Sequence, residues 1–514
     1  MRKRRSVRHP ADSRGLGRVA WAVLALLAFP ESGCNLAPKY ARPSVQTPAG
    51  FREAGSAPAQ DVAWTQARPG DGAMGGRWWK IYNDPGLDAL EDQVQVSNQT
   101  IAAAEANFRA ARAAAEFARS ALFPTIGAAP AVSRARPSQT LSLPPGTFSA
   151  PTIVDEFSLP VEASYEIDLW GRVRNSARAG ALAAQASAAD LATALLGTQA
   201  ELARDYFQLR ALDAERHILD DTVASYRQTL DMTSALFRSG IDSQEDVTRA
   251  QTQLDTVIAQ DTDIGVARAS YEHAIAVLAG KPPSDVSLPV MPLAALPPAV
   301  PAGLPSDLLQ RRPDIAAAER RVAAANAQIG IARSAYFPNL TLGAAGGWES
   351  YQFARWFEWP SRFWSVGPEL AGTLLDGGAR RAQTEEARAG FDEAVANYRQ
   401  AVLSAFQAVE DNLSALRILA DEAGQQRTAV EASGHLLDLA MTRYRTGIDS
   451  YLNVAIAQTT LLSNREAEVQ IRLRQMTSSV SLIMALGGGW NSSELPRIAG
   501  ATAGGAPRPG ANTP

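Results

Sequence analysis

The residue with the most distinctive chemistry in this sequence is its single cysteine, Cys34. It directly follows residues 1–33, which have the layout of an export signal: basic residues, a short apolar run at 21–29, and small residues at the boundary. A thiol at such a boundary is a site for lipid attachment. Glu31 stands three residues before the cysteine, where lipoprotein signals normally carry leucine. We expect residues 1–33 to be removed and Cys34 to carry lipid.

The other groups capable of catalytic or metal chemistry are scattered. The four histidines (His9, His217, His273 and His435) lie far apart, and one cysteine cannot form a disulfide within the chain or a cysteine-based zinc site. The sequence contains neither a GxxxxGK[ST] phosphate loop nor a GxGxxG motif after a strand. We therefore expect no catalytic residue, no cofactor site and no metal site, and we do not expect an enzyme.

Composition narrows the class of protein further. The chain has 514 residues with 49 Lys+Arg against 53 Asp+Glu, and a formal net charge of -4 gives no indication of a nucleic-acid partner. Aromatic residues make up only 7%, while alanine is abundant. This balance favours long helices with small contact residues over a bulky core, and no transmembrane helix is expected after the signal.

A direct repeat organises the chain. Three short segments recur in the same order: Ile101–Glu105 as Ile315–Glu319, Arg119–Pro124 as Arg333–Pro338, and Gly240–Ser243 as Gly447–Ser450. We expect one repeat at residues 77–280 and a second at 306–487, joined by a proline-rich linker at 281–305. Residues 34–76 are expected to be an extended, lipid-bearing segment, and 488–514 a disordered tail.

Each repeat contains period-two alternation that predicts two strands. The clearest run is 157–169, in which Phe157, Leu159, Val161, Ala163, Tyr165 and Ile167 alternate with polar residues. Similar alternation begins at Ile126, at Leu340 and at Trp364. Strands this long with one apolar face fit a membrane barrel better than a soluble sandwich. Four acids would face the lumen: Glu162, Glu166, Asp168 and Glu369.

Helical segments surround these strands. One in each repeat (87–123 and 306–337) stops at a Phe-Pro pair, because proline cannot continue a helix. A longer one follows (171–237 and 378–444), and 66 residues of helix would span about 100 Å. Gly240 and Gly447 end these helices, and further helices run to Leu278 and Leu486. Such lengths predict coiled-coil packing.

Several stretches resemble one known family, the TolC-like outer-membrane factors in their lipoprotein branch. They are Cys34–Pro43, Arg77–Trp79, Leu308–Glu319, Phe337–Pro338, and the paired turns Phe237–Val247 and Tyr444–Val454. The resemblance implies an α+β membrane protein, a homotrimer in which each chain gives four strands to a 12-stranded outer-membrane β-barrel. A long α-helical barrel continues it into the periplasm.

The resemblance also implies a function. It indicates a passive export duct for small molecules, lipid-anchored in the outer membrane, whose partners are a periplasmic adaptor (membrane fusion) protein and an inner-membrane pump. Three alternatives stay open: a channel for type I protein secretion, a periplasmic coiled-coil scaffold without a pore, and an enzyme anchored to the membrane. The long alternation from Phe157 to Ile167 argues against the scaffold.

The resemblance further implies a gate and adaptor-contact region at the turns around Gly240 and Gly447. In the family a tyrosine three residues before the second glycine contacts an acid six residues after the first; Tyr444 and Asp246 match, with Glu245 beside the acid. Where well-known members carry a basic residue and two aspartates after the second glycine, this chain carries Asp449, Asn453 and Ile456. Arg443, with Arg238 and Arg445, is expected to pair with Asp242, Asp246 or Asp449.

Lipid attachment gives the first testable prediction. The mature chain should begin at Cys34 and carry acyl groups, and Cys34→Ala should weaken membrane anchoring without abolishing the trimer, because the barrel inserts by itself. Mass spectrometry of the purified N-terminal peptide checks this. An unmodified Cys34, or cleavage at another bond, would contradict it.

Overall fold

The computed structural model describes residues 34–53, 76–136, 153–298, 300 and 305–500. Its contacts divide the chain into two compact units. The sheet unit contains residues 121–175 and 330–381 together with 34–37, and the helical unit contains 38–120, 176–329 and 382 onward. Each unit takes segments from both halves of the chain, so the compact units do not follow the expected repeat boundaries. The expected signal peptide lies outside the described residues.

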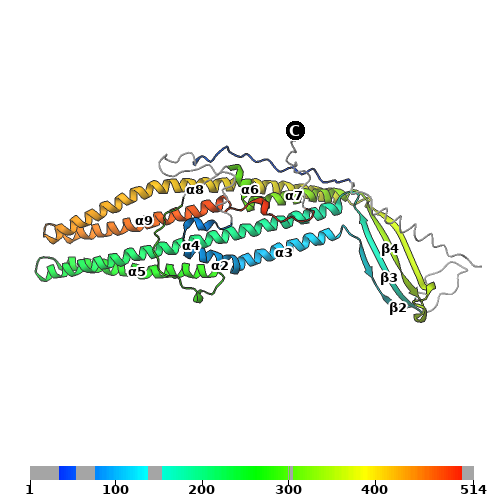
Figure 1. The fold of residues 1–514 in the computed structure, drawn as a ribbon, viewed down its shortest axis with the longest axis horizontal. Helices are drawn as coiled ribbons and strands as arrows, with labels where there is room; N and C mark the ends of the chain where they lie inside the picture. Colours follow the sequence, from blue (N-terminus) through cyan, green and yellow to red (C-terminus); the bar gives the residue numbers. More distant parts are fainter. Residues whose placement is uncertain (1–33, 54–75, 137–152, 299, 301–304, 501–514) are drawn as a thin grey trace, which may run out of the picture. The chain divides into compact units, whose positions relative to one another are not determined.

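The sheet unit is built on one antiparallel sheet (Figure 1). Its strands are β1 (Thr125–Ala128), β2 (Ala131–Ala135), β3 (Val154–Ile167), β4 (Asn339–Ser350) and β5 (Arg362–Ala371). The order is β1–β3–β4–β5, with β2 also paired to β3. The central strands β3 and β4 therefore come from different halves of the chain, while β1/β2 and β5 are edges without a further partner among the described residues.

The register confirms that one face of the sheet is apolar and the other is polar or small. On the apolar face Tyr165 lies opposite Leu342, and Ile126 lies opposite Ala163. On the other face Thr341 lies between Glu166 and Glu369. Because side chains alternate along each strand, this register carries the pattern predicted from the sequence along the sheet as far as its loop end. There Arg134, Asp155 and Arg362 lie on the apolar face and Phe363 lies on the polar one.

The first strand differs from the single run expected. It is divided into β1 and β2, although both keep one continuous register with β3 and the N–H of Ala129 still donates to the carbonyl of Pro160 at 3.2 Å. Pro130 and Pro160 both lack a backbone N–H, so the ladder loses its donors at this point. The interruption therefore reflects missing hydrogen bonds rather than a shift of register.

The helices of the chain are α2 (Pro85–Ser97), α3 (Gln99–Ser120), α4 (Arg172–Arg238), α5 (Gln244–Leu278), α6 (Leu308–Arg311), α7 (Pro313–Ser334), α8 (Ala379–Arg445) and α9 (Tyr451–Ala485). Helices α4 and α8 each have 67 residues, and α5 and α9 each have 35. The long helices predicted from the sequence are confirmed. Figure 1 shows α4 joined to α5, and α8 joined to α9, as two long antiparallel hairpins.

The expected helix at 87–123 is two helices. Asn98 separates α2 from α3, because its Oδ1 accepts hydrogen bonds from the N–H groups of Thr100 (2.8 Å) and Ile101 (3.0 Å) and so caps α3. Its amide donates to the carbonyl of Leu278 at 2.8 Å. In the second half, Pro313 begins α7 after the four-residue α6. A side-chain cap therefore sets the first boundary and a proline the second, and hydrophobic periodicity predicts neither.

Small contact residues bring helices close together, as the composition predicted. A Cβ on Gly180 of α4 would lie 3.3 Å from the Cα of Ala115 on α3. The expectation that small residues pack the helices without a bulky hydrophobic core is wrong for one region, however. Trp78 and Trp79, in a short 3-10 helix (Trp78–Tyr82), are 2% and 0% exposed, and they share a core with Tyr206 and Phe207 of α4. A local aromatic core thus supplements the alanine contacts.

Helix α4 is notable for its apolar composition. Of the helices in the described ranges, it is the one long and apolar enough to cross a membrane by length and composition. A third of the apolar stretch is buried inside the protein. Abundant alanine raises its hydropathy while keeping the side chains short enough for helix packing.

Part of the C-terminal tail is ordered against the helices. Residues 488–500 were expected to be disordered, but Trp490 and Leu495 pack on Ala189, Ala316 and Ala317, so that expectation is wrong for this part of the tail. Burial of two large apolar side chains against small ones explains the order. The expected disorder at 501–514 lies outside the described residues.

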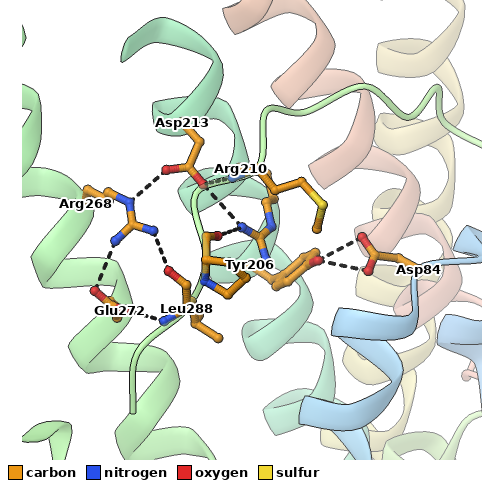
Figure 2. Close-up of polar contacts among 9 residues, drawn as sticks. Asp84, Tyr206, Arg210, Asp213, Arg268, Glu272 and Leu288 are labelled. Carbon is orange, nitrogen blue, oxygen red and sulfur yellow. Dashed lines mark hydrogen bonds and ion pairs between the residues drawn. The ribbon is translucent and has the colours of Figure 1, made fainter. Parts of the chain in front are cut away.

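The linker is held by a group of charges, here called the linker clasp: the buried Arg210 and Asp213 of α4 with the partly buried Arg268 and Glu272 of α5 (Figure 2). Arg210 donates to the carbonyl of Pro289 at 2.6 Å, and Asp213 accepts from the N–H of Met291 at 2.9 Å. Arg268 and Glu272 bind the carbonyl and N–H of Leu288. The backbone at 288–291 is therefore fastened to both helices.

The linker clasp gives the second prediction. Asp213 is 1% exposed and is shared by two arginines, so Asp213→Ala should leave the buried Arg210 without an anion and leave Arg268 with Glu272 alone. We expect destabilisation of about 3 kcal/mol and faster proteolysis at residues 286–291. Thermal unfolding and limited proteolysis measure these effects.

The matched control is Asp263→Ala, which removes an exposed acid of α5. It should change stability by less than about 0.5 kcal/mol. Equal effects of the two substitutions would mean that the linker clasp does not hold the linker.

Candidate functional site

The turns joining the long helices have the same backbone design in both hairpins. Gly240 and Gly447 adopt positive φ values of 75° and 71°, which favour glycine because it has no Cβ. In each turn the next residue's N–H bonds back across the helix end, from Ile241 to Leu236 (3.0 Å) and from Ile448 to Arg443 (2.9 Å). These Schellman-type closures confirm the predicted glycine stops.

Tyr444 is the centre of a contact between the two hairpins. Its side chain is 2% exposed, and its hydroxyl donates to the carboxylate of Asp242 and lies 2.9 Å from Thr233 Oγ1. Burial, and then the hydrogen bond with Asp242, raise the pKa of Tyr444 above its ordinary value. The hydroxyl therefore keeps its proton and remains a hydrogen-bond donor to a charged acceptor.

The acid expected to partner Tyr444 was Asp246, and this expectation is wrong within the chain. Asp246 instead caps α5: its N–H donates to Ser243 Oγ at 3.2 Å, and its Oδ2 accepts from that hydroxyl at 2.7 Å. Position 246 is the third residue of α5, where an acid closes a capping box. Asp242 lies in the turn itself and is free of that role, so it reaches the tyrosine.

The remaining turn residues make shorter-range contacts. Arg443 pairs with Asp449 at 3.3 Å, and Asp449 also accepts from the amide of Asn453 at 2.5 Å. Glu245 pairs with Arg249 at 2.7 Å. The Arg443–Asp449 and Glu245–Arg249 pairs are each largely exposed on one side and contribute about 0–1 kcal/mol. Asn453 and Ile456 are exposed on α9, on the side away from its buried residues.

Sequence reasoning missed a second set of polar contacts between the hairpins. Tyr451 donates to Gln253 Oε1 at 2.6 Å, and Gln458 donates to Thr229 Oγ1 at 3.0 Å. The Tyr451 ring lies 5.8 Å from the Tyr444 ring. The position of Tyr451 directly after the turn was the one indication of this contact in the sequence, but its partner Gln253 is distant in sequence. Together with Tyr444–Asp242, these contacts join α4 and α5 to α8 and α9.

The four acids expected in the lumen fall into two groups. Glu166 is bound by Arg172, with Nε 2.8 Å from Oε1, and Asp168 accepts from the backbone N–H (2.8 Å) and side chain (3.2 Å) of Arg174. Asp168 also lies beyond the end of β3, so its expected position on the strand is wrong. Glu162 and Glu369 lie on the polar face and form no ion pair in the part of the chain that the structure describes. Local arginines at the start of α4 therefore neutralise half of the expected acids.

Cys34 is exposed at the start of the described chain. The neighbouring Asn35 accepts a hydrogen bond from the amide of Asn175 at 2.9 Å. Asn175 lies in the first turn of α4, eight positions from the end of β3 along the chain. The cysteine is thus tethered beside the end of the sheet from which α4 leaves.

No three His, Cys, Asp or Glu side chains in the described ranges come together in a way that could hold a metal ion. Histidines 217, 273 and 435 take part in no such group. The arrangement that the chain does build is a two-faced sheet together with two long hairpins whose turns contact each other. These features define a membrane channel of the outer-membrane type.

Comparison with known proteins agrees with this class. The model of a family described as outer membrane efflux protein matches residues 90–281 and 304–488. The chain belongs to this family, and the resemblance seen in the sequence is confirmed. It is an outer-membrane protein that extends into the periplasm, in a family of efflux channels rather than enzymes.

Individual relatives extend over nearly the whole chain. The toluene efflux pump outer membrane protein TtgC of Pseudomonas putida is 32% identical over 470 residues, covering 91% of this chain and 95% of the relative. The pyoverdine export outer membrane protein OpmQ of Pseudomonas aeruginosa is 32% identical and covers 81% and 88%. The solved structure of the outer-membrane channel OprN matches with a TM-score of 0.82 and 28% identity, over 89% of this chain and all of that one.

The Tyr444–Asp242 contact gives the third prediction. Tyr444→Phe and Asp242→Ala should each raise resting single-channel conductance, because each removes the same hydrogen bond of about 1.5–3 kcal/mol to a charged group. The double variant should show little additional increase, which a double-mutant cycle measures.

Asp246→Ala is the control that separates the two acids. It should loosen the start of α5 but add its effect to that of Tyr444→Phe independently. Coupling of Tyr444 to Asp246 and not to Asp242 would restore the partner expected from the sequence.

Proposed function

We propose that three copies of this chain form the outer-membrane duct of a tripartite efflux pump. Each chain consists of two repeats of one unit and contributes four strands to a 12-stranded barrel. The helices continue the barrel as a tunnel through the periplasm. The observation that carries this proposal is the four-strand-wide sheet with one apolar face, one polar face and two open edges.

The open edges support an assembly of several chains. An unpaired strand edge in a bilayer leaves backbone N–H and C=O groups without partners, which costs several kcal/mol for each group. Four strands are too few to close around a polar lumen, whereas twelve can do so. Edge strand β5 of one chain would then pair with the β1/β2 edge of the next.

The dimensions of the apolar face support a membrane position. From Phe157 to Ile167 the strand advances ten residues, about 33 Å at ~3.3 Å per residue. With a strand tilt of about 40° this gives a height of roughly 25 Å, which matches the apolar band of outer-membrane barrels. The wide exposure of apolar residues such as Trp364 (79%) and Leu370 (66%) would be costly in water.

The connectivity supports an orientation. Thr125, Ile167, Asn339 and Ala371 all lie at one end of the sheet, and each leads to a helix. Strand β2 ends and β3 begins at the other end of the sheet, and the loop at 351–361 leaves from there. The helix-bearing end would face the periplasm and the loop end the cell exterior. Lipid on Cys34, next to the start of α4, would then insert at the periplasmic surface of the same membrane.

The partners and cargo follow from the assembly. A duct without a phosphate-binding loop supplies no energy, so transport would depend on an inner-membrane pump joined through a periplasmic adaptor at the helical tips. Two relatives are named for toluene efflux and pyoverdine export, which differ greatly in size and polarity. A polar duct closed at its tips would accept small molecules chosen by the pump. Type I protein secretion remains the alternative cargo class.

The fourth prediction tests the duct. The purified protein should migrate as a heat-modifiable trimer and give single-channel conductance in lipid bilayers. Because Glu162 and Glu369 lack a cationic partner, the open pore should prefer cations, and Glu162→Gln with Glu369→Gln should reduce that preference. Reversal potentials in asymmetric salt measure it.

Glu166→Gln with Arg172→Gln is the matched control, because it removes an acid together with the arginine that neutralises it. It should leave the cation preference almost unchanged, since the net charge of the lumen stays the same. A monomer without conductance would favour the scaffold without a pore. A conducting trimer with anion preference would contradict only the assignment of the lumen acids.

A further inference from the structure

The loop between β4 and β5 is unusually rich in aromatic residues. Residues 351–361 contain Tyr351, Phe353, Trp356, Phe357 and Trp359. Two short 3-10 helices shape the loop, Phe353–Arg355 and Trp359–Ser361, and the hydroxyl of Ser361 donates to the carbonyl of Arg355 at 2.7 Å. The loop is therefore a folded structure at the end of the sheet opposite to the helices.

This loop packs on the apolar side of the sheet. The ring of Phe157 lies 5.5 Å from Phe353 and 5.7 Å from Trp356, and the ring of Trp348 lies 6.0 Å from Phe357. Phe157 and Trp348 both belong to the apolar face by register. The loop consequently extends the apolar face outward.

Much of the loop's aromatic surface remains uncovered within the chain. Phe353 is 69% exposed, Phe357 62% and Trp359 76%. Aromatic side chains in such a position are typical of the boundary between lipid tails and headgroups. On the orientation proposed above, this boundary is that of the outer leaflet.

Two arginines distinguish this surface from an ordinary aromatic belt. Arg362 lies opposite Trp348 in the register, on the apolar face, and its guanidinium group stacks over the ring of Trp359. Arg355 is exposed in the loop. Neither forms an ion pair with any described residue, whereas nearby Arg134 is paired with Asp155 at 3.4 Å. Glu358 is the loop's one acid, so this surface keeps an excess of positive charge.

We infer that Arg355, Arg362, Phe353, Phe357 and Trp359, here called the loop pad, bind a phosphorylated lipid of the outer leaflet. The arginines would hold the headgroup phosphate and the rings would contact the acyl chains. A guanidinium group at the edge of a hydrocarbon layer is stabilised by an anion, and its planar donors match phosphate oxygens. This inference rests on the proposed function for the orientation of the barrel.

The test compares lipid A carrying its phosphates with the same lipid after dephosphorylation. Native mass spectrometry of the trimer in detergent should give about tenfold tighter binding of the phosphorylated form, equivalent to about 1.4 kcal/mol. Arg355→Gln with Arg362→Gln should bring the two affinities together. Arg362→Lys should keep part of the difference because it retains the charge without the bidentate geometry. Trp359→Leu should weaken both forms.

The matched control is Arg109→Gln with Arg427→Gln, which removes two exposed arginines of the helical unit and should leave the preference unchanged. Equal binding of both lipids by the unmodified trimer would overturn the inference and leave only an aromatic belt. Competition by millimolar inorganic phosphate at the same arginines would mean that the loop pad binds free phosphate. Failure of trimer formation or conductance would instead contradict the proposed function.

Discussion

The organisation of this protein depends on one constraint: backbone hydrogen-bonding groups inside a membrane must find partners. A sheet that is apolar on one face can lie against lipid, but its edges cannot be left open there. Within the described chain β3 and β4 are paired on both sides, while β1/β2 and β5 are paired on one side only. In the function proposed here, the demand for partners at these edges is what would make a single chain incomplete and an assembly necessary.

The helical unit has to keep very long helices aligned with one another without a large hydrophobic core. Small residues such as Gly180 and Ala115 allow close approach, and the aromatic group around Trp78 and Trp79 fixes one level of the bundle. Polar contacts add specificity that small residues lack. The linker clasp fastens the connection between the two halves of the chain to α4 and α5 through Arg210 and Asp213.

Sequence patterns predicted those parts of the structure that depend on local periodicity. Alternation predicted the two faces of β3 and β4, and Gly240 and Gly447 predicted the ends of α4 and α8. Predictions failed where a contact distant in sequence decided the outcome. Packing of Trp490 on Ala316 orders a segment that its composition suggested would be disordered.

The same distinction applies to the candidate site. The location of the site could be predicted because the glycine turns are visible in the sequence, but the hydrogen-bond partner of Tyr444 could not. Asp242 and Asp246 are both acids close to the turn, and only the capping of α5 by Asp246 decides which one reaches Tyr444. Likewise, the neutralisation of Glu166 by Arg172 depends on the short connection at 168–171, which brings the two side chains together. Sequence spacing shows which residues lie near a turn, but it does not show which of them already make another hydrogen bond or ion pair.

The contact between Tyr444 and Asp242 joins the two hairpins of one chain, and this has a consequence for how an assembled tunnel would open. Contacts between neighbouring subunits would have to break around the whole ring at once. A contact within each subunit can be broken in one subunit at a time. The proposed trimer would then have a series of partly open states, and the flow through the tunnel would depend on how many subunits have lost the contact.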